Sequence, residues 1–432
     1  MKYYSLNQQS PKVSFKEATI KGQAPDKGLY FPESLPRLDK NWIAGINGKS
    51  NAALAFDVIQ PYAGNDIPED ELRRIVAETV NFPSPLVQVN DHIFALELFH
   101  GPTLAFKDTG ARFMSRCLGY FAKERSEKIT VLVATSGDTG GAVAHGFYDV
   151  EGVDVVILYP SGKVSSVQEK QLTALGKNIH ALEVNGTFDD CQRMVKQAFA
   201  DESLTQKRVL TSANSINVAR WLPQQFYYFF AYKQWSEKEN PPVFCVPSGN
   251  FGNICAGMLA HISGLPAAHF IAACNANNVV PRYLHSGKYE VKEALPTLSN
   301  AMDVGDPSNF VRVLQLFGNN FINLKKMLSG YTITDAETKD TIKKVWEKTG
   351  YLTDPHGAVG YLSLQRYIAQ HPGQKGIFLE TAHPVKFYDV VEPLTGEKVP
   401  LPPSVERLLH LPKHSIVIDA AYPALKNYLL QH

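Results

Sequence analysis

One lysine of this sequence stands where lysine is uncommon. Lys107 follows an apolar run from Phe94 to Phe99 and a turn at Gly101-Pro102, and it precedes an expected helix with apolar positions from 113 to 121. A lysine at such a junction is partly desolvated and lies near the positive end of a helix, which lowers the pKa of its amine. A neutral amine attacks carbonyl groups, so the predicted chemistry is a Schiff base. The alternative is a structural lysine paired with Asp108, and this stretch alone favours that alternative.

A glycine-rich loop is the second candidate for chemistry. The loop Ser248-Gly-Asn-Phe-Gly-Asn253 follows an expected strand that ends at Val246, and it precedes an expected helix. Gly249 and Gly252 let the backbone approach a ligand, and the first amides of the helix face the same point, which suits a phosphate. The loop is neither a Walker loop nor a dinucleotide fingerprint, so ATP and dinucleotides are disfavoured. A plain glycine turn is the alternative.

Four further polar segments follow expected strands. The loop from Thr135 to Gly140 offers hydroxyls and helix amides to a small carboxylate or a ring hydroxyl, although a simple helix cap is the alternative. The segment from Ser212 to Arg220 offers a guanidinium to a second anion, unless it is a solvated loop. Lys163 either adds charge to the same cleft or is an exposed lysine. Thr381 presents a hydroxyl to the crevice of the sheet.

The elements that must position these loops alternate between strands and helices. Continuous Val, Ile and Leu runs separated by amphipathic helices predict parallel sheets covered on both faces, which is an open α/β fold. Ligands of such sheets bind outside the carboxyl ends of the strands. The expected strands are 129–134, 153–159, 179–184, 209–210, 243–247, 270–274 and 376–380, and the expected helices are 69–80, 141–148, 166–175, 189–199, 253–262 and 310–316.

The expected domains follow from this alternation and from a proline-rich linker at 81–85. We expect an additional N-terminal domain over 1–90, a large α/β domain over 91–130 and 236–400, a smaller α/β domain over 131–235, and a C-terminal extension over 401–432.

Composition excludes several classes of protein. Among the 432 residues, 43 Lys and Arg nearly balance 42 Asp and Glu, so no global field attracts nucleic acid. The five cysteines form no CxxC pair, which favours reduced thiols in a cytosolic protein. No apolar run reaches the length of a membrane span, and the histidines form no metal motif. We therefore expect a cytoplasmic protein that binds no nucleic acid, no membrane and no metal.

These motifs together resemble pyridoxal-phosphate enzymes of fold type II, the tryptophan synthase beta-like group, and most closely the threonine synthase family. The resemblance extends from about residue 3 to about 390. The segments that carry it, in the family's order, are 99–108, 135–140, 214–217, 248–252, 299–304 and 381–384.

The resemblance implies a role for each candidate residue. Lys107 would hold pyridoxal 5'-phosphate as a Schiff base and then move protons. Thr381 would hydrogen-bond the pyridine nitrogen, and Asp138 stands where the wider group has an asparagine beside the ring hydroxyl. The backbone amides that would bind the cofactor phosphate belong to Gly249, Asn250, Phe251, Gly252 and Asn253. The residues that would bind substrate are Thr135, Ser136, Gly137 and Thr139 for the carboxylate, and Asn214, Ser215 and Arg220 for the phosphate. Lys163 is kept as a further substrate-binding candidate, which would add charge to the same cleft.

The implied reaction is the last step of threonine biosynthesis, a lyase reaction that turns O-phospho-L-homoserine and water into L-threonine and phosphate by γ-elimination and β-addition of water. It needs two anion sites, and the sequence supplies two loops for them. The alternatives are a related lyase acting on serine, threonine or O-phosphothreonine, and a noncatalytic protein that binds a phosphate ligand. We expect a monomer or a small homo-oligomer, and the roles of Asp303, His383 and Lys386 stay open.

Overall fold

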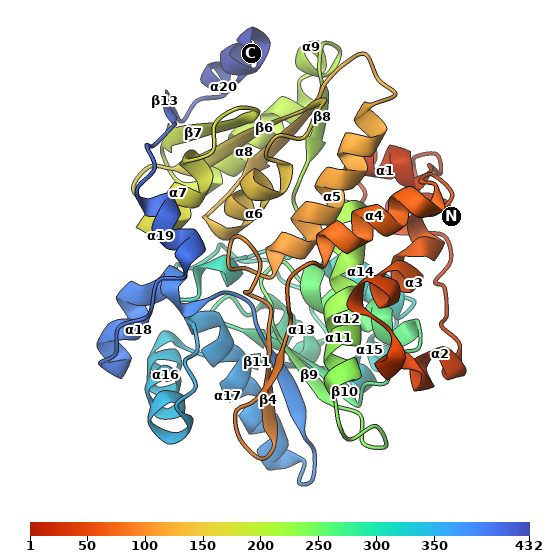
Figure 1. The fold of residues 1–432 in the computed structure, drawn as a ribbon, viewed down its shortest axis with the longest axis vertical. Helices are drawn as coiled ribbons and strands as arrows, with labels where there is room; N and C mark the ends of the chain where they lie inside the picture. Colours follow the sequence, from red (N-terminus) through yellow and green to blue (C-terminus); the bar gives the residue numbers. More distant parts are fainter.

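Two parallel sheets organise the chain, and helices pack around both (Figure 1). The structure is a computed structural model that describes residues 1–432. The large sheet has six strands in the order β11-β10-β9-β12-β4-β3, and the small sheet has five in the order β13-β7-β6-β5-β8. Every neighbouring pair is parallel except β3 and β4. In Figure 1 the small sheet lies at the top and the large sheet at the bottom, and the loop that leads into α5 runs between them.

The predicted strands are confirmed to within two residues at each end. All residues of β5, β6, β9, β10 and β12 are buried, which explains their continuous apolar sequences. The large sheet contains β3 (Leu86–Gln88), β4 (Ile93–Glu97), β9 (Val243–Pro247), β10 (His269–Cys274), β11 (Leu328–Thr332) and β12 (Gly376–Glu380), and the small sheet contains β5 (Ile129–Ala134), β6 (Val153–Pro160), β7 (Ile179–Asn185), β8 (Val209–Ser212) and β13 (Ile416–Asp419).

The helices near the site begin earlier than predicted. Helix α5 (Lys107–Ala122) starts at the lysine itself, and α6 (Asp138–Phe147) starts three residues before the expected position. The glycines at the start of α6 permit close packing: a Cβ at Gly140 would lie 2.5 Å from Leu172 Cδ2 and from Thr135 Cγ2. In the sequence these glycines look like loop residues, because the packing partner Leu172 lies on a different helix.

The other helices have the following bounds. They are α1 (Phe15–Lys21), α2 (Lys40–Ala44), α3 (Asn51–Ala63), α4 (Glu69–Thr79), α7 (Ser166–Thr173), α8 (Phe188–Ala200), α9 (Glu202–Thr205), α10 (Val218–Trp221), α11 (Gln225–Gln234), α12 (Gly252–Ile262), α13 (Val279–Ser286), α14 (Phe310–Leu316), α15 (Phe321–Met327), α16 (Asp335–Thr349), α17 (Pro355–Gln370), α18 (Tyr388–Thr395), α19 (Pro403–Leu409) and α20 (Tyr422–Gln431), and a short antiparallel pair joins β1 (Tyr3–Ser5) to β2 (Tyr30–Pro32). None of these helices combines the length and the apolar character that a bilayer crossing requires.

The N-terminal residues share a core with the rest of the molecule. Phe15 of α1 lies 6.4 Å and 6.3 Å, between ring centroids, from Phe113 and Phe121 of α5. One hydrophobic cluster includes these rings together with buried residues of α3, α4, α11 and α12. The expected N-terminal domain therefore packs as one body with α5, and its limits remain a prediction.

The C-terminal segment differs from the simple extension that the sequence suggested. Strand β13 pairs with the edge strand β7, with Ile416 opposite Leu182. Leu425 and Leu429 of α20 are buried in the core of the small sheet. In Figure 1 the dark blue C-terminal chain runs past α7 to this edge. Residues 401–432 thus complete the small sheet, and β13 was not predicted because it is short and mostly exposed.

Candidate active site

Lys107 is the first residue of α5, and the loop before it is fixed to the end of β12. The backbone N–H of Phe106 donates to the carbonyl of Thr381 at 2.9 Å, and the N–H of His383 donates to the carbonyl of Leu104 at 3.0 Å. Although part of the Lys107 side chain remains accessible, protein encloses its amine. This burial lowers the pKa of Lys107 to about 8, Asp138 opposes the shift, and Lys386 and Arg220 add to it. The amine is therefore partly neutral near neutral pH.

The alternative partner of Lys107 is engaged elsewhere. The Asp108 carboxylate accepts hydrogen bonds from the backbone N–H and the hydroxyl of Thr103. Asp108 is buried and shapes the turn that precedes α5. The charge that acts on Lys107 comes instead from Asp138, so the structure does not contain the Lys107–Asp108 pair.

Asp138 forms a buried ion pair with Lys386. The distance from Asp138 Oδ1 to Lys386 Nζ is 2.6 Å, and both side chains are almost fully buried. Gln168 Nε2 donates to the same carboxylate oxygen at 3.0 Å, and Lys386 Nζ donates to the carbonyl of Thr103 at 3.0 Å. Burial opposes ionisation of Asp138, but Lys386 and Lys107 outweigh it and hold its pKa below the usual range. Lys386, whose role the sequence left open, thus links α6 to the loop before Lys107.

The hydroxyl loop after β5 is shaped by Thr135. Thr135 Oγ1 accepts the backbone N–H groups of Gly137 and Gly140, each at 2.9 Å. Ser136 and Thr139 are half-buried, so their hydroxyls remain accessible at the start of α6. Thr135 therefore organises the loop and already holds the amide of Gly137, while Ser136 and Thr139 lie at the open side of the loop.

The glycine-rich loop between β9 and α12 has the form of an anion cradle. Phe251 adopts the left-handed conformation with φ of 61° and, as the residue before α12, makes no side-chain capping bond to the first amides of the helix. A Cβ at Gly249 would lie 2.6 Å from the Cα of Met302, so only glycine fits there. Asn253 Nδ2 donates to the carbonyl of Pro247 at 2.8 Å and fixes the turn.

The three residues expected at the substrate phosphate differ in their surroundings, and their shared role remains a prediction. Arg220 is buried beside α5, where its Nε lies 3.6 Å from the Cβ that Gly110 would carry. Its Nε and Nη1 have no hydrogen-bond partner, and burial lowers its pKa to about 10. The Asn214 side-chain oxygen is likewise buried without a partner. Ser215, in contrast, lies at the glycine-rich loop, where Asn250 Nδ2 donates to its hydroxyl oxygen at 3.1 Å.

The two remaining predicted residues lie at different depths. Thr381 is buried at the end of β12, directly across from the loop that carries Lys107. Lys163 is exposed in the turn after β6, and its charge acts on Cys191 of α8. Its place in the substrate site remains a prediction.

The sequence did not predict a buried network of hydrogen-bonded polar groups that lies beside the site and supports it. Asp354 Oδ2 lies 2.6 Å from His356 Nδ1, and the backbone N–H of Ala301 donates to His356 Nε2 at 3.2 Å. The N–H of Asp354 donates to the Glu380 carboxyl at 2.8 Å, and burial raises the pKa of Glu380 well above its usual range. The only signal in the sequence is Asp354-Pro355, which marks a helix start. These hydrogen bonds connect Glu380, the residue before Thr381, to the turn at Ala301 and Met302, which packs on Gly249.

Asp303 stabilises that same turn. The Asp303 carboxylate accepts hydrogen bonds from the hydroxyl of Thr297 at 2.7 Å, from the backbone N–H of Thr297 at 2.9 Å and from Asn275 Nδ2 at 2.9 Å. Asp303 therefore holds the segment 299–303 in place, and that segment contacts the glycine-rich loop through Met302.

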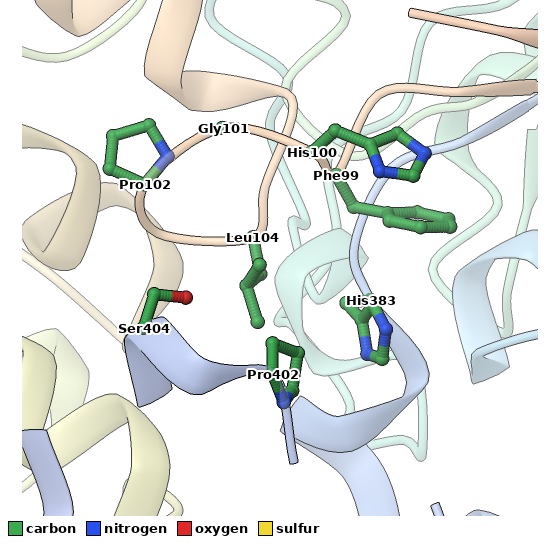
Figure 2. A pocket seen from close by; sticks show the side chains of 8 residues that line it. All are labelled: Phe99, His100, Gly101, Pro102, Leu104, His383, Pro402 and Ser404. Carbon is green, nitrogen blue, oxygen red and sulfur yellow. The ribbon is translucent and has the colours of Figure 1, made fainter. Parts of the chain in front are cut away.

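His383 lies at a cavity of about 410 Å³ on the outer side of the Lys107 loop (Figure 2). Figure 2 shows Leu104 pointing into this cavity toward Pro402. Burial and the neighbouring His100 lower the pKa of His383 to about 4, so its ring is neutral near pH 7. The residues that line the cavity are Phe99, His100, Gly101, Pro102, Leu104, His383, Pro402 and Ser404, and Lys107 is not among them.

The donor set fits pyridoxal phosphate. The cradle at α12 offers uncapped amides to a phosphate, and Lys107 offers an amine of lowered pKa to an aldehyde. Together with the two parallel sheets, these features define a pyridoxal-phosphate-dependent enzyme of fold type II. Residues 77–379 match the family model described as pyridoxal-phosphate dependent enzyme. Residues 2–80 match the threonine synthase N terminus, and residues 357–429 match the threonine synthase C-terminal model.

Similarity to known proteins identifies one family within this class of enzymes. Threonine synthase of Haemophilus influenzae is 45% identical over 435 residues and covers all of both chains. The crystal structure of threonine synthase from Escherichia coli aligns with a TM-score of 0.93 at 42% identity, with full coverage of both chains. A pyridoxal-phosphate-bound threonine synthase from Brucella melitensis aligns with a TM-score of 0.93 at 36% identity, covering 100% of this chain and 99% of that one. The chain belongs to the threonine synthase family, which confirms the predicted fold class and cofactor.

Proposed function

We propose that the chain converts O-phospho-L-homoserine and water to L-threonine and phosphate. The observation that carries the proposal is the buried guanidinium of Arg220, whose Nε and Nη1 lack a partner. Leaving such donors unpaired costs free energy unless a ligand satisfies them. An anion beside Lys107, in addition to the one at the glycine-rich loop, is what a substrate with its own phosphate supplies.

Lys107 is the proposed proton carrier of the reaction. The bound cofactor supplies an electron sink for the carbanion that forms when the Cα proton leaves. With a pKa of about 8, the Lys107 amine accepts a proton and returns it at small cost near neutral pH. Arg220, Asn214 and Ser215 would hold the γ-phosphate, so the proton transfers and the departure of phosphate occur at neighbouring points.

The carboxylate of the substrate is assigned to the loop after β5. Ser136 and Thr139 would donate their hydroxyls, while Thr135 keeps the loop in shape by accepting the N–H groups of Gly137 and Gly140. Thr381 is assigned to the pyridine nitrogen. A hydroxyl does not protonate that nitrogen as a carboxylate partner would, so the ring would stay largely neutral.

The ion pair of Asp138 and Lys386 would keep the small sheet closed over the site. It connects α6 with the segment after β12 at a distance of 2.6 Å. Such closure excludes bulk water, which protects reactive species from premature hydrolysis.

The test is the simultaneous measurement of phosphate and threonine from O-phospho-L-homoserine. The native protein should form both in equal amounts, and Lys107→Ala should form neither. Arg220→Ala should keep the cofactor spectrum and raise the KM for O-phospho-L-homoserine by about 10-fold or more, because a charge-assisted hydrogen bond is lost. Phosphate without threonine would overturn the proposal in favour of a different lyase, and an unchanged KM in Arg220→Ala would remove its main support.

A further inference from the structure

We infer that His356 is a positioning residue of the cofactor site, because its Nε2 atom holds a turn against the glycine-rich loop and so sets the affinity for the cofactor phosphate. The inference rests on the role proposed for that loop, which is to hold the phosphate of pyridoxal 5'-phosphate. The turn is the short 3₁₀ helix η3 (Asn300–Met302). His356 is the second residue of α17, it is buried, and its two hydrogen bonds go to Asp354 and Ala301. It therefore acts on the loop through the turn.

The turn η3 lies directly against the glycine-rich loop. A Cβ at Gly249 would lie 2.6 Å from the Cα of Met302 and 2.9 Å from the carbonyl oxygen of Ala301. Both are backbone atoms, which cannot move aside as the end of a flexible side chain can. Because packed interiors transmit small displacements, the position of the turn determines the position of Gly249 and of the amides that follow it.

One side chain holds the backbone N–H at the centre of this turn. The neighbouring N–H of Met302 donates to the carbonyl of Ser299 at 2.9 Å, inside the same segment. The N–H of Ala301 donates instead to His356 Nε2 at 3.2 Å. Ala301 thus connects the two contacts, since its N–H binds His356 while its carbonyl oxygen packs on Gly249.

The imidazole accepts this hydrogen bond because its proton is held on the other nitrogen. A backbone N–H only donates, so the geometry assigns the lone pair to Nε2 and the proton to Nδ1. Nδ1 lies 2.6 Å from Asp354 Oδ2. The other oxygen of Asp354 accepts the N–H of Gly357 at 2.7 Å at the start of α17, where the helix dipole favours a negative charge. The carboxylate of Asp354 thus fixes the tautomer that the turn requires.

The position of the imidazole is fixed from two further sides. Its ring packs on Phe387, with 4.9 Å between the ring centroids. The backbone N–H of Asp354 donates to Glu380 Oε1 at 2.8 Å, which ties the start of α17 to the end of β12. Since that bond uses only backbone on the side of α17, a substitution at His356 leaves it in place. Such a substitution therefore tests the turn separately from Thr381, the residue that follows Glu380.

The experiment uses two amide side chains, each of which replaces one imidazole nitrogen. Glutamine at position 356 brings its amide oxygen to the place of Nε2, whereas asparagine reaches only the place of Nδ1. Both apoproteins are titrated with pyridoxal 5'-phosphate and with pyridoxal, and the dissociation constants are measured by absorbance. His356→Asn should raise the constant for pyridoxal 5'-phosphate about 5-fold or more, because the N–H of Ala301 loses its acceptor, and should leave that for pyridoxal within about twofold. His356→Gln should keep both constants within about twofold of the native values.

A control variant and a spectrum of the native protein complete the test. His269 is a buried histidine of β10 whose Nε2 bonds to Ser329 Oγ at 2.8 Å, and His269→Gln should change neither constant. The KM of His356→Asn for O-phospho-L-homoserine at saturating cofactor should match that of the native protein. NMR of the imidazole nitrogens of the native protein should show a neutral ring with its proton on Nδ1, and His356→Gln should remove that signal. A proton on Nε2 of His356 would overturn the inference without any variant.

Equal losses for the two ligands in His356→Asn would also overturn the inference, because they would indicate a general loosening of the site. Recovery by asparagine rather than glutamine would do the same, since it would confine the role of His356 to the start of α17. The outcome is separate from that of the proposed function. A selective loss of affinity for pyridoxal 5'-phosphate supports the role of His356 even if no threonine forms, and threonine formation with unchanged affinities in His356→Asn removes only that role.

Discussion

Two regions of the site offer groups that suit negative charge, and they are built differently. The phosphate cradle, formed by Ser248–Asn253, uses backbone amides and neutral side chains that make hydrogen bonds within the loop and to Ser215. The lysine pocket, formed by Lys107, Asp138, Arg220 and Lys386, uses buried charges, and two nitrogens of Arg220 remain unpaired. Side chains that are hydrogen-bonded to one another keep their shape without a ligand, whereas unpaired buried charges respond to every charge that enters. The comparison fits the proposal that the cradle would hold the cofactor phosphate and that the pocket would meet the reacting groups of the substrate.

The largest expected effect comes from breaking the ion pair of the lysine pocket. Lys386→Met leaves Asp138 buried and unpaired, which should lower the free energy of unfolding by about 3–5 kcal/mol. Denaturant unfolding of the apoprotein measures the loss. The double variant Asp138→Asn with Lys386→Met removes both charges and should recover most of it. A single variant within about 1 kcal/mol of the native protein would mean that the pocket does not depend on buried charge.

The amine of Lys107 should respond to pH as a lysine of lowered pKa. Below pH 8 it is protonated, and above pH 8 it is neutral, so the rate of its reaction with pyridoxal should rise with pH and level off above a midpoint of about 8. At pH 7 the neutral fraction should exceed that of an ordinary lysine by about 300-fold. Trapping the product by borohydride reduction at several pH values measures the profile.

The neighbours of Lys107 provide a check on this assignment. Burial is the main cause of the shift, and Arg220 contributes to it, so Arg220→Ala should move the midpoint upward. A midpoint near 10 in the native protein, or a downward move in the variant, would contradict the electrostatic description of the pocket.

A backbone change should damage the cradle and spare the pocket. Gly249→Ala places a Cβ 2.6 Å from the Cα of Met302, so the loop must shift. The dissociation constant for pyridoxal 5'-phosphate should rise by roughly 10-fold to 100-fold, while the KM at saturating cofactor changes little, because the distance-sensitive amides belong to the cradle. Gly48→Ala, at a glycine with open space around it, is the matched control. Equal changes in both constants would show that the two regions are not independent.

The sequence predicts the central strands of the two sheets better than the edge strands. Buried parallel strands such as β6 and β9 require continuous apolar residues, so the apolar runs in the sequence locate them. Strand β11 is half-exposed and reads Leu-Ser-Gly-Tyr-Thr, which carries no such signal. The sequence does not reveal the start of α6 either. Gly140 is required there by its contact with Leu172, although glycine has a low helix propensity.

The site shows a similar limit. The strand-loop-helix pattern predicts that Lys107 and Asn250 occupy loops at strand ends, because that rule concerns neighbours in sequence. The contact between Ser215 and Asn250 and the ion pair between Asp138 and Lys386 join segments that are 35 and 248 residues apart. Side-chain pairs of this kind depend on the packing of the two sheets, and no local pattern records them.

The smallest expected effect concerns Lys163, the predicted substrate contact that lies outside both regions. Its side chain is exposed, so its charge is screened beyond about 8 Å at physiological ionic strength. If it only adds to the field over the cleft, Lys163→Ala should lower kcat/KM by less than about threefold at low salt, and the difference should vanish at about 0.15 M salt. The exposed Lys196 of α8 supplies the control, since Lys196→Ala should have no effect at either salt concentration. A salt-independent loss of about 10-fold or more would instead require Lys163 to contact the substrate directly, and the lysine pocket would then extend to the turn after β6.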